Sequence, residues 1–132
     1  MAGVVGGLAG GVIFGLMMQM MGMLAMVAGL IGSGSVAVGW AVHLAISAFF
    51  GAVFGGVLGG ALRSVGMGVG IGAAYGAALW VIGPLLLMPA RMGMPLFLIN
   101  EMTMNSLVGH LMFGVVLGGV AAVLVRRARV TS

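Results

Sequence analysis

The chain contains no cysteine and no lysine, and Glu101 is its only acidic residue. The absence of cysteine excludes disulfides, thiolate metal sites, iron–sulfur clusters and cysteine nucleophiles. One carboxylate and two histidines are too few for a paired-acid site, and serine–histidine–aspartate chemistry lacks its acid. We therefore expect a protein that is not an enzyme. The pI of about 11.8 arises from only five arginines and does not indicate nucleic-acid binding.

Charge of either sign is scarce. Only 5% of the 132 residues are charged and 63% are hydrophobic, whereas a soluble domain carries about 25% charged residues. The chain has too few charged residues to cover a water-exposed surface. We therefore expect lipid to surround most of it, and the lipid bilayer to be its main partner. A membrane-spanning helix needs about 20 apolar residues, which leaves room for four. We predict an all-α, polytopic integral membrane protein forming a single domain over residues 1–132.

Four long apolar runs carry this prediction. They cover residues 8–30, 36–58, 67–88 and 106–125. They lack the roughly 10-residue apolar–polar alternation of barrel strands. Pro84 is predicted to kink the third helix. The longest connection, residues 88–106, is expected to lie on the membrane surface.

The arginines predict the topology. Arg63 and the C-terminal arginines 126, 127 and 129 fall on one side if the chain has four spans, and Arg91 falls on the other with Glu101. Because positive charge is retained on the cytoplasmic side, we predict that both termini face the cytoplasm and that the protein resides in the plasma membrane.

Two halves of the chain resemble each other. Phe14-Gly15 matches Tyr75-Gly76 at an offset of 61, and His43-Leu44 matches His110-Leu111 at an offset of 67. This pattern predicts two helical hairpins, residues 1–62 and 63–132, arranged as a parallel tandem repeat.

Glycines four residues apart recur in every predicted helix. Small residues at this spacing let helix backbones approach closely in lipid. The predicted packing glycines are Gly11, Gly15, Gly51, Gly55, Gly72, Gly76, Gly114 and Gly118. They fall in the cytoplasmic half, and the outer half carries methionines and other bulky residues. The helices are expected to close at the cytoplasmic end and to splay outside, where either a cavity forms or methionines fill the space.

His43 and His110 are the candidate binding residues. His43 shares a helix face with Ser47 and Gly51, and His110 is followed by Gly114 and Gly118, so both imidazoles are expected inside the bundle. Either each histidine hydrogen-bonds a neighbouring helix, or the pair ligates a haem or chlorin, or shares a soft metal with methionines. The absence of any cofactor is the default expectation. Copper(I) capture by the methionines of residues 88–106 is a lesser alternative.

These observations leave the function open among three classes. The leading hypothesis is a small, non-enzymatic bundle that associates with itself or with other membrane subunits through its glycine-rich faces. The alternatives are a cofactor-binding protein using His43 and His110, and a small oligomeric channel or transporter.

Overall fold

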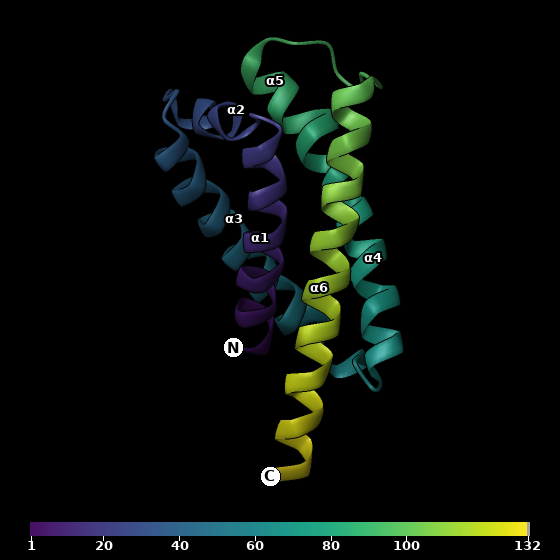
Figure 1. Ribbon diagram of the computed structural model, residues 1–132. Coiled ribbons are helices and arrows are strands. Elements are labelled where there is room, and N and C mark those ends of the chain that lie inside the picture. The colour runs from purple at the N-terminus through teal and green to yellow at the C-terminus, as the bar shows by residue number, and fades with distance from the viewer. Residues whose placement is uncertain (132) are drawn as a thin grey trace.

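The computed structural model describes residues 1–131 and the side chains of residues 1–130, and all regular structure in this range is helical (Figure 1). Four segments are long and apolar enough to cross a membrane: Ala2–Met20, Val36–Ala61, Val65–Met92 and Glu101–Val130. The expected all-helical class, with four helices long and apolar enough to span a membrane, is therefore confirmed. The elements are α1 (Ala2–Met20), α2 (Leu24–Ala28), η1 (Gly29–Ile31), α3 (Val36–Leu58), η2 (Gly59–Ala61), α4 (Val65–Ile82), η3 (Gly83–Leu87), α5 (Met88–Met92) and α6 (Glu101–Thr131).

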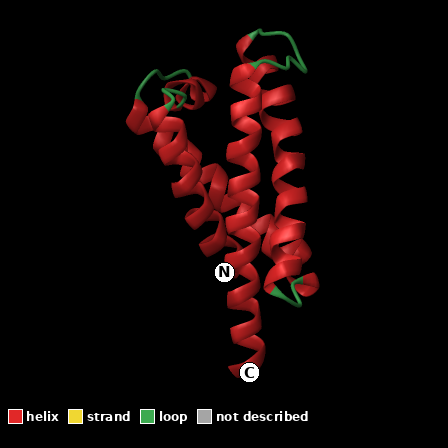
Figure 2. Cartoon of the chain, turned by 45° about the vertical axis from the view of Figure 1, so that its right-hand side comes forward, coloured by secondary structure: helices red, strands yellow, loops and turns green. Residues whose placement is uncertain are grey.

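The four long helices form an open arc in the order α3, α1, α6, α4. The extensive contacts are those of α1 with α3, α1 with α6, and α4 with α6. Both termini lie toward one end, which we call the base, while α2 and α5 lie at the opposite end, which we call the cap (Figure 1). Helix α3 leans away from the other long helices as it nears the cap (Figure 2). The arc is therefore open between α3 and α4 at the end near the cap.

Large apolar side chains lie on the surface of the bundle as well as in its core. Exposed side chains on α1 and α3 are large and apolar, while the contact faces are rich in glycine. The exposed side chains include Val5, Leu8, Val12 and Leu16 on α1, and Ile46, Phe49, Val53 and Val57 on α3. The buried positions of α1 include Gly3, Gly6, Gly7, Gly10, Gly11 and Gly15. Lipid suits such a surface, because it solvates apolar side chains and leaves close backbone packing to hold helices together.

The first span differs from its predicted bounds. The predicted run of residues 8–30 is wrong, since α1 covers Ala2–Met20. Gly22 ends the helix with φ +71°. Its N–H donates to Gln19 O at 3.2 Å, and Met23 N donates to Met18 O at 2.9 Å. This is a Schellman ending, which glycine adopts without steric cost. The apolar residues that follow form α2 and η1 instead of continuing the span.

Helix α3 has the bounds predicted for the second span, whereas α6, Glu101–Thr131, extends beyond the predicted residues 106–125 at both ends. Helix α3 covers Val36–Leu58. Helix α6 begins at Glu101, five residues before the predicted start, because Asn100 and Thr103 form a reciprocal cap. Thr103 N donates to Asn100 Oδ1 at 2.9 Å, and Asn100 N donates to Thr103 Oγ1 at 2.8 Å. Such an exchange satisfies backbone groups that the first turn leaves without partners.

The third span continues past its predicted end. Pro84 lies in η3, a π-helical turn, and the chain then runs into α5. Proline lacks an N–H, so the turn is rearranged where a regular helical bond cannot form. Pro89 likewise cannot donate to Leu85 O, which accepts from Phe97 N at 2.9 Å instead. The predicted surface connection of residues 88–106 is therefore wrong in extent: α5 and the start of α6 leave only residues 93–100 between helices.

Candidate functional site

Rows of glycine at helix–helix contacts, which we call glycine seams, hold the helices together near the base. One seam lies within each hairpin. In the α1–α3 seam, a Cβ atom on Gly51 would collide with the backbone of Gly3 and Gly7, and one on Gly55 would meet Gly3. Nearer the cap, Gly11 lies against Ser47, and Gly15 lies against the ring of Trp40. These contacts place the backbones of α1 and α3 next to each other along most of α1.

The α4–α6 seam is built in the same way. Gly72 lies against the backbone of Gly114 and Gly118, and Gly76 lies against the backbone of His110 and Gly114. Gly118 in turn lies against Gly68 and Gly72. The eight glycines singled out in the sequence are thus all at helix–helix contacts within one chain.

A third seam joins the two hairpins. Gly6 of α1 lies against Leu117 of α6, and Gly10 lies against Phe113. Gly6 and Gly10 are not among the packing glycines predicted from the sequence. The sequence sign that could have identified them is the pair of adjacent glycines Gly6-Gly7, which recurs four residues later as Gly10-Gly11. One glycine of each pair faces α3, and the other faces α6.

Helices α3 and α4 meet through aromatic side chains. The Tyr75 hydroxyl donates to Phe50 O at 2.7 Å. The rings of Tyr75 and Phe54 lie 5.0 Å apart between centroids. Below this contact the seams fill the interior, and above it the arc is open.

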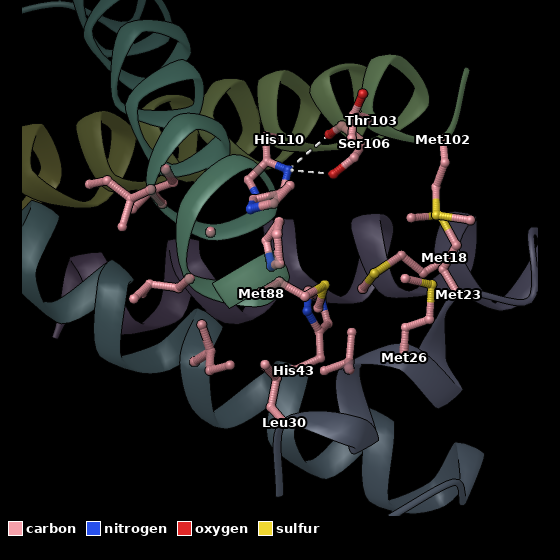
Figure 3. Close-up of a pocket in the computed structure, with 18 of the residues that line it drawn as sticks. Met18, Met23, Met26, Leu30, His43, Met88, Met102, Thr103, Ser106 and His110 are labelled. Atoms are coloured by element: carbon pink, nitrogen blue, oxygen red, sulfur yellow. Dashed lines mark hydrogen bonds between the residues drawn. The ribbon is translucent and has the colours of Figure 1, made fainter. Parts of the chain in front are cut away.

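A cavity of about 380 Å³ occupies the open region near the cap. Its lining is mostly apolar and includes Met18, Met23, Met26, Met88 and Met102, whose side chains are drawn in Figure 3. The methionines line this space and do not fill it. Helix α2, α5 and residues 93–100 contribute to the lining from the cap side.

The cavity lies in the gap between α3 and α4, the two ends of the arc. Ile46 of α3, Ile82 of α4 and Leu87 of η3 line it and are exposed, and the lining near the cap is exposed at Met94, Leu98 and Met102. We call the gap beside Ile46, Ile82 and Leu87 the mouth. Because α3 and α4 are the ends of the arc, the mouth faces the surroundings of the bundle at a depth where the helices are apolar.

His43 and His110 both line the cavity. His43 Nε2 lies 2.8 Å from Gly11 O on α1, which ties α3 to its neighbour. His110 Nδ1 lies 2.8 Å from Ser106 O and 3.3 Å from Ser106 Oγ, within its own helix (Figure 3). Each imidazole therefore uses one nitrogen to bind a carbonyl.

Phe14 contacts both imidazoles. Its ring centroid lies 5.3 Å from that of His43 and 4.7 Å from that of His110, with both pairs in edge-on arrangements. A macrocycle ligated by both histidines would have to displace this ring. In the sequence, Phe14 stands out only as part of the aromatic–glycine pair that recurs at Tyr75-Gly76. No local pattern reveals its position between two histidines that are far apart in the chain.

Polar contacts hold the cap over the cavity. Arg91 Nε donates to Leu30 O at 3.2 Å, joining α5 to η1. Trp40 Nε1 donates to Gln19 Oε1 at 2.7 Å, and Trp80 Nε1 donates to Thr103 O at 2.8 Å. These bonds fasten the cap ends of α1 to α3 and of α4 to α6.

Within the part of the chain that the structure describes, no three His, Asp or Glu side chains come together as a metal site. Comparisons with protein-family models, with curated proteins and with solved structures found no match. The fold and the site together define a membrane-type helical bundle with a laterally open, mostly apolar cavity.

Proposed function

We propose that this protein is a non-enzymatic integral membrane bundle that binds a small, largely apolar molecule in the cavity near its cap. The observation that carries the proposal is the cavity itself. A volume of about 380 Å³ with an apolar lining and a few polar groups is typical of small-molecule sites. The mouth between α3 and α4 gives a path from lipid that does not pass through water.

The rigid base supports this function. Three glycine seams fix α1, α3, α4 and α6 relative to one another, so the open region beyond them keeps its shape. The lining reaches down to Ser47 and Phe50, next to the Tyr75 contact. This arrangement favours a binding site over a channel.

Association with a second copy or another membrane subunit is a second candidate function. The eight glycines expected to mediate it are occupied within the chain, so a different surface must serve. Helix α4 exposes four small residues at spacing four: Gly66, Gly70, Ala74 and Ala78. Exposed small residues at this spacing are typical of membrane helix contacts.

We propose that both termini face the cytoplasm and that the cap lies in the outer half of the plasma membrane. The arrangement of charge supports this orientation: Arg63 adjoins η2 at the base, and Arg91 and Glu101 adjoin the cap. Arg129 NH2 lies 3.4 Å from the carbonyl oxygens of Gly59 and Gly60 in η2, so Arg129 is next to the turn that carries Arg63.

We also propose that the hairpins of residues 1–62 and 63–132 are tandem copies. Gly3 meets Gly51 and Gly55, while Gly68 meets Gly118 and Ala122. Gly7 meets Ser47 and Gly51, while Gly72 meets Gly114 and Gly118. These equivalent contacts support an offset of 65 for the first helices and 67 for the second. The first value differs by about one turn from the offset of 61 given by the aromatic–glycine pairs.

Photolabelling tests the binding function. Dodecane carrying a terminal diazirine is irradiated with the protein in mild detergent, and the labelled residues are mapped by mass spectrometry. Saturable labelling of cavity residues is expected, and Ile82→Trp should abolish it by blocking the mouth. Val81→Trp is the matched control, because Val81 is exposed beside Ile82 and does not line the cavity. Non-saturable labelling, or equal labelling of both variants, would contradict the proposal.

A further inference from the structure

We propose that the molecule bound in the cavity carries a hydroxyl group and donates a hydrogen bond from it to His43 or His110. The ligand class is thus a lipid alcohol or phenol, with an apolar body among the methionines. This inference rests on the proposed binding function and names the chemistry of its ligand.

The protonated nitrogen of His43 follows from its partner. A backbone carbonyl oxygen only accepts hydrogen bonds, so Nε2, at 2.8 Å from Gly11 O, must carry the proton. In a neutral imidazole the other nitrogen, Nδ1, then has a lone pair and no proton. No carboxylate lines the cavity to pair with an imidazolium, and burying an unpaired charge costs much free energy.

His110 has the opposite tautomer. Its Nδ1 lies 2.8 Å from Ser106 O and must donate to that carbonyl. Nε2 of His110 therefore carries the lone pair. The two histidines differ in which nitrogen is protonated, yet each presents one hydrogen-bond acceptor.

Both acceptor nitrogens are accessible and belong to side chains that line the cavity. Neither Nδ1 of His43 nor Nε2 of His110 has a hydrogen-bond partner among the described residues. Across those residues, no buried side-chain nitrogen or oxygen atom lacks a partner. The two nitrogens are consequently not sealed in protein, and both rings line the cavity. A ligand that reaches them meets two acceptors.

An acceptor nitrogen in apolar surroundings selects a donor. A hydroxyl group can donate to it, whereas an ether or ketone oxygen cannot. The lining includes no lysine or arginine, so the cavity has no cation to hold a carboxylate or phosphate headgroup. A lipid alcohol or phenol therefore matches the two histidine acceptors and the apolar part of the lining.

Competition between matched ligands tests the inference. Dodecan-1-ol and 1-methoxydodecane differ by replacement of the hydroxyl proton with a methyl group. Each is titrated against the dodecane diazirine probe. One hydrogen bond predicts that the alcohol competes roughly 2- to 10-fold better than the ether. In the double variant His43→Leu/His110→Leu this preference should disappear, provided that its thermal melting shows a folded protein.

Nitrogen-15 NMR of histidine-labelled wild-type protein gives a readout that needs no variant. The spectrum should show one protonated and one unprotonated nitrogen in each ring. An unprotonated resonance should move on addition of dodecan-1-ol and stay in place with 1-methoxydodecane.

The outcomes separate the two proposals. If neither competitor displaces the probe, the binding function itself fails. If both compete equally, or neither shifts a histidine resonance, the cavity binds apolar molecules and the hydroxyl inference is overturned. Silver(I) is added as a probe of soft-metal binding by imidazole and thioether groups. If silver(I) alone displaces the probe and shifts the histidine resonances, the site is a soft-metal site and the inference is also overturned.

Discussion

The base and cap halves of this bundle are built from the same four helices and yet pack in opposite ways. Near the base, glycine faces glycine, and backbones touch with no space for a Cβ atom. Near the cap, methionine, leucine and phenylalanine side chains surround a cavity of about 380 Å³. The difference follows from side-chain size along each helix, because helices that touch at one end and carry bulky groups at the other must diverge.

The comparison indicates where stability and binding reside. In lipid, helix association depends on close packing and polar contacts, since burial from water contributes little. The base provides the close packing, and the cap relies on a few hydrogen bonds such as that of Arg91 with Leu30 O. Substitutions in the base should therefore affect folding, and those in the cap should affect the shape and access of the cavity.

The largest effect is expected from Gly72→Leu in the α4–α6 seam. A side chain there collides with the backbone of Gly114, which cannot move aside as a flexible side chain would. The loss should reach or exceed the upper end of the roughly 1–3 kcal/mol typical of overpacking. Gly56→Leu in α3 is the control, since a Cβ atom at Gly56 would have no neighbouring atom within 4 Å. Thermal melting in detergent should separate the two variants, and equal melting temperatures would show that the seam is not tight.

A smaller effect is expected from Asn100→Ala at the start of α6. Removing the side chain abolishes the bond from Thr103 N to Asn100 Oδ1. Loss of such a cap costs about 1 kcal/mol. Amide hydrogen exchange should accelerate at Thr103 and Met104, with the base unchanged. Asn105→Ala, within the same helix, should leave this exchange as in the wild type, and acceleration in both variants would contradict a capping role.

The helix bounds show which parts of the fold could be predicted from the sequence. Four apolar runs predicted the class because runs of this length and apolarity are typical of helices that cross a membrane. The end of α1 was missed because residues 17–30 are apolar almost throughout, and Gly22 is the one local sign that the chain turns. The start of α6 was predicted five residues too late because Asn100 and Thr103 are polar residues in a mixed stretch, and their role as a helix cap depends on the hydrogen bonds between them.

The cavity could only be half predicted. The distribution of glycine and methionine indicates which half is open. It does not indicate that Phe14 contacts both His43 and His110, since that depends on how the two hairpins pack across α1 and α6. The hydrogen-bond partners that define the histidine tautomers likewise come from tertiary structure.

Tyr75→Phe should have a still smaller effect, at the boundary between the two halves. It removes the bond to Phe50 O and retains the ring that packs against Phe54. Polar contacts between membrane helices average about 0.6 kcal/mol, and a loss of this size is expected. Equilibrium unfolding in mixed detergent measures it. Phe54→Leu, which alters ring packing and keeps the hydroxyl, is the comparison, and an unchanged unfolding midpoint for Tyr75→Phe would mean that α3 and α4 do not depend on this bond.

The smallest effect on stability is expected from Arg91→Gln in the cap. Arg91 is exposed, and its one hydrogen bond to Leu30 O joins α5 to η1. Exposed polar contacts contribute little to global stability, so the melting temperature should not change. Amide hydrogen exchange in Leu24–Ala28 and the rate of probe entry should both rise, because local opening needs far less free energy than unfolding. Arg63→Gln at the base is the matched control and should leave both rates unchanged. A lower melting temperature for Arg91→Gln would mean that the cap, as well as the glycine seams, holds the helices together.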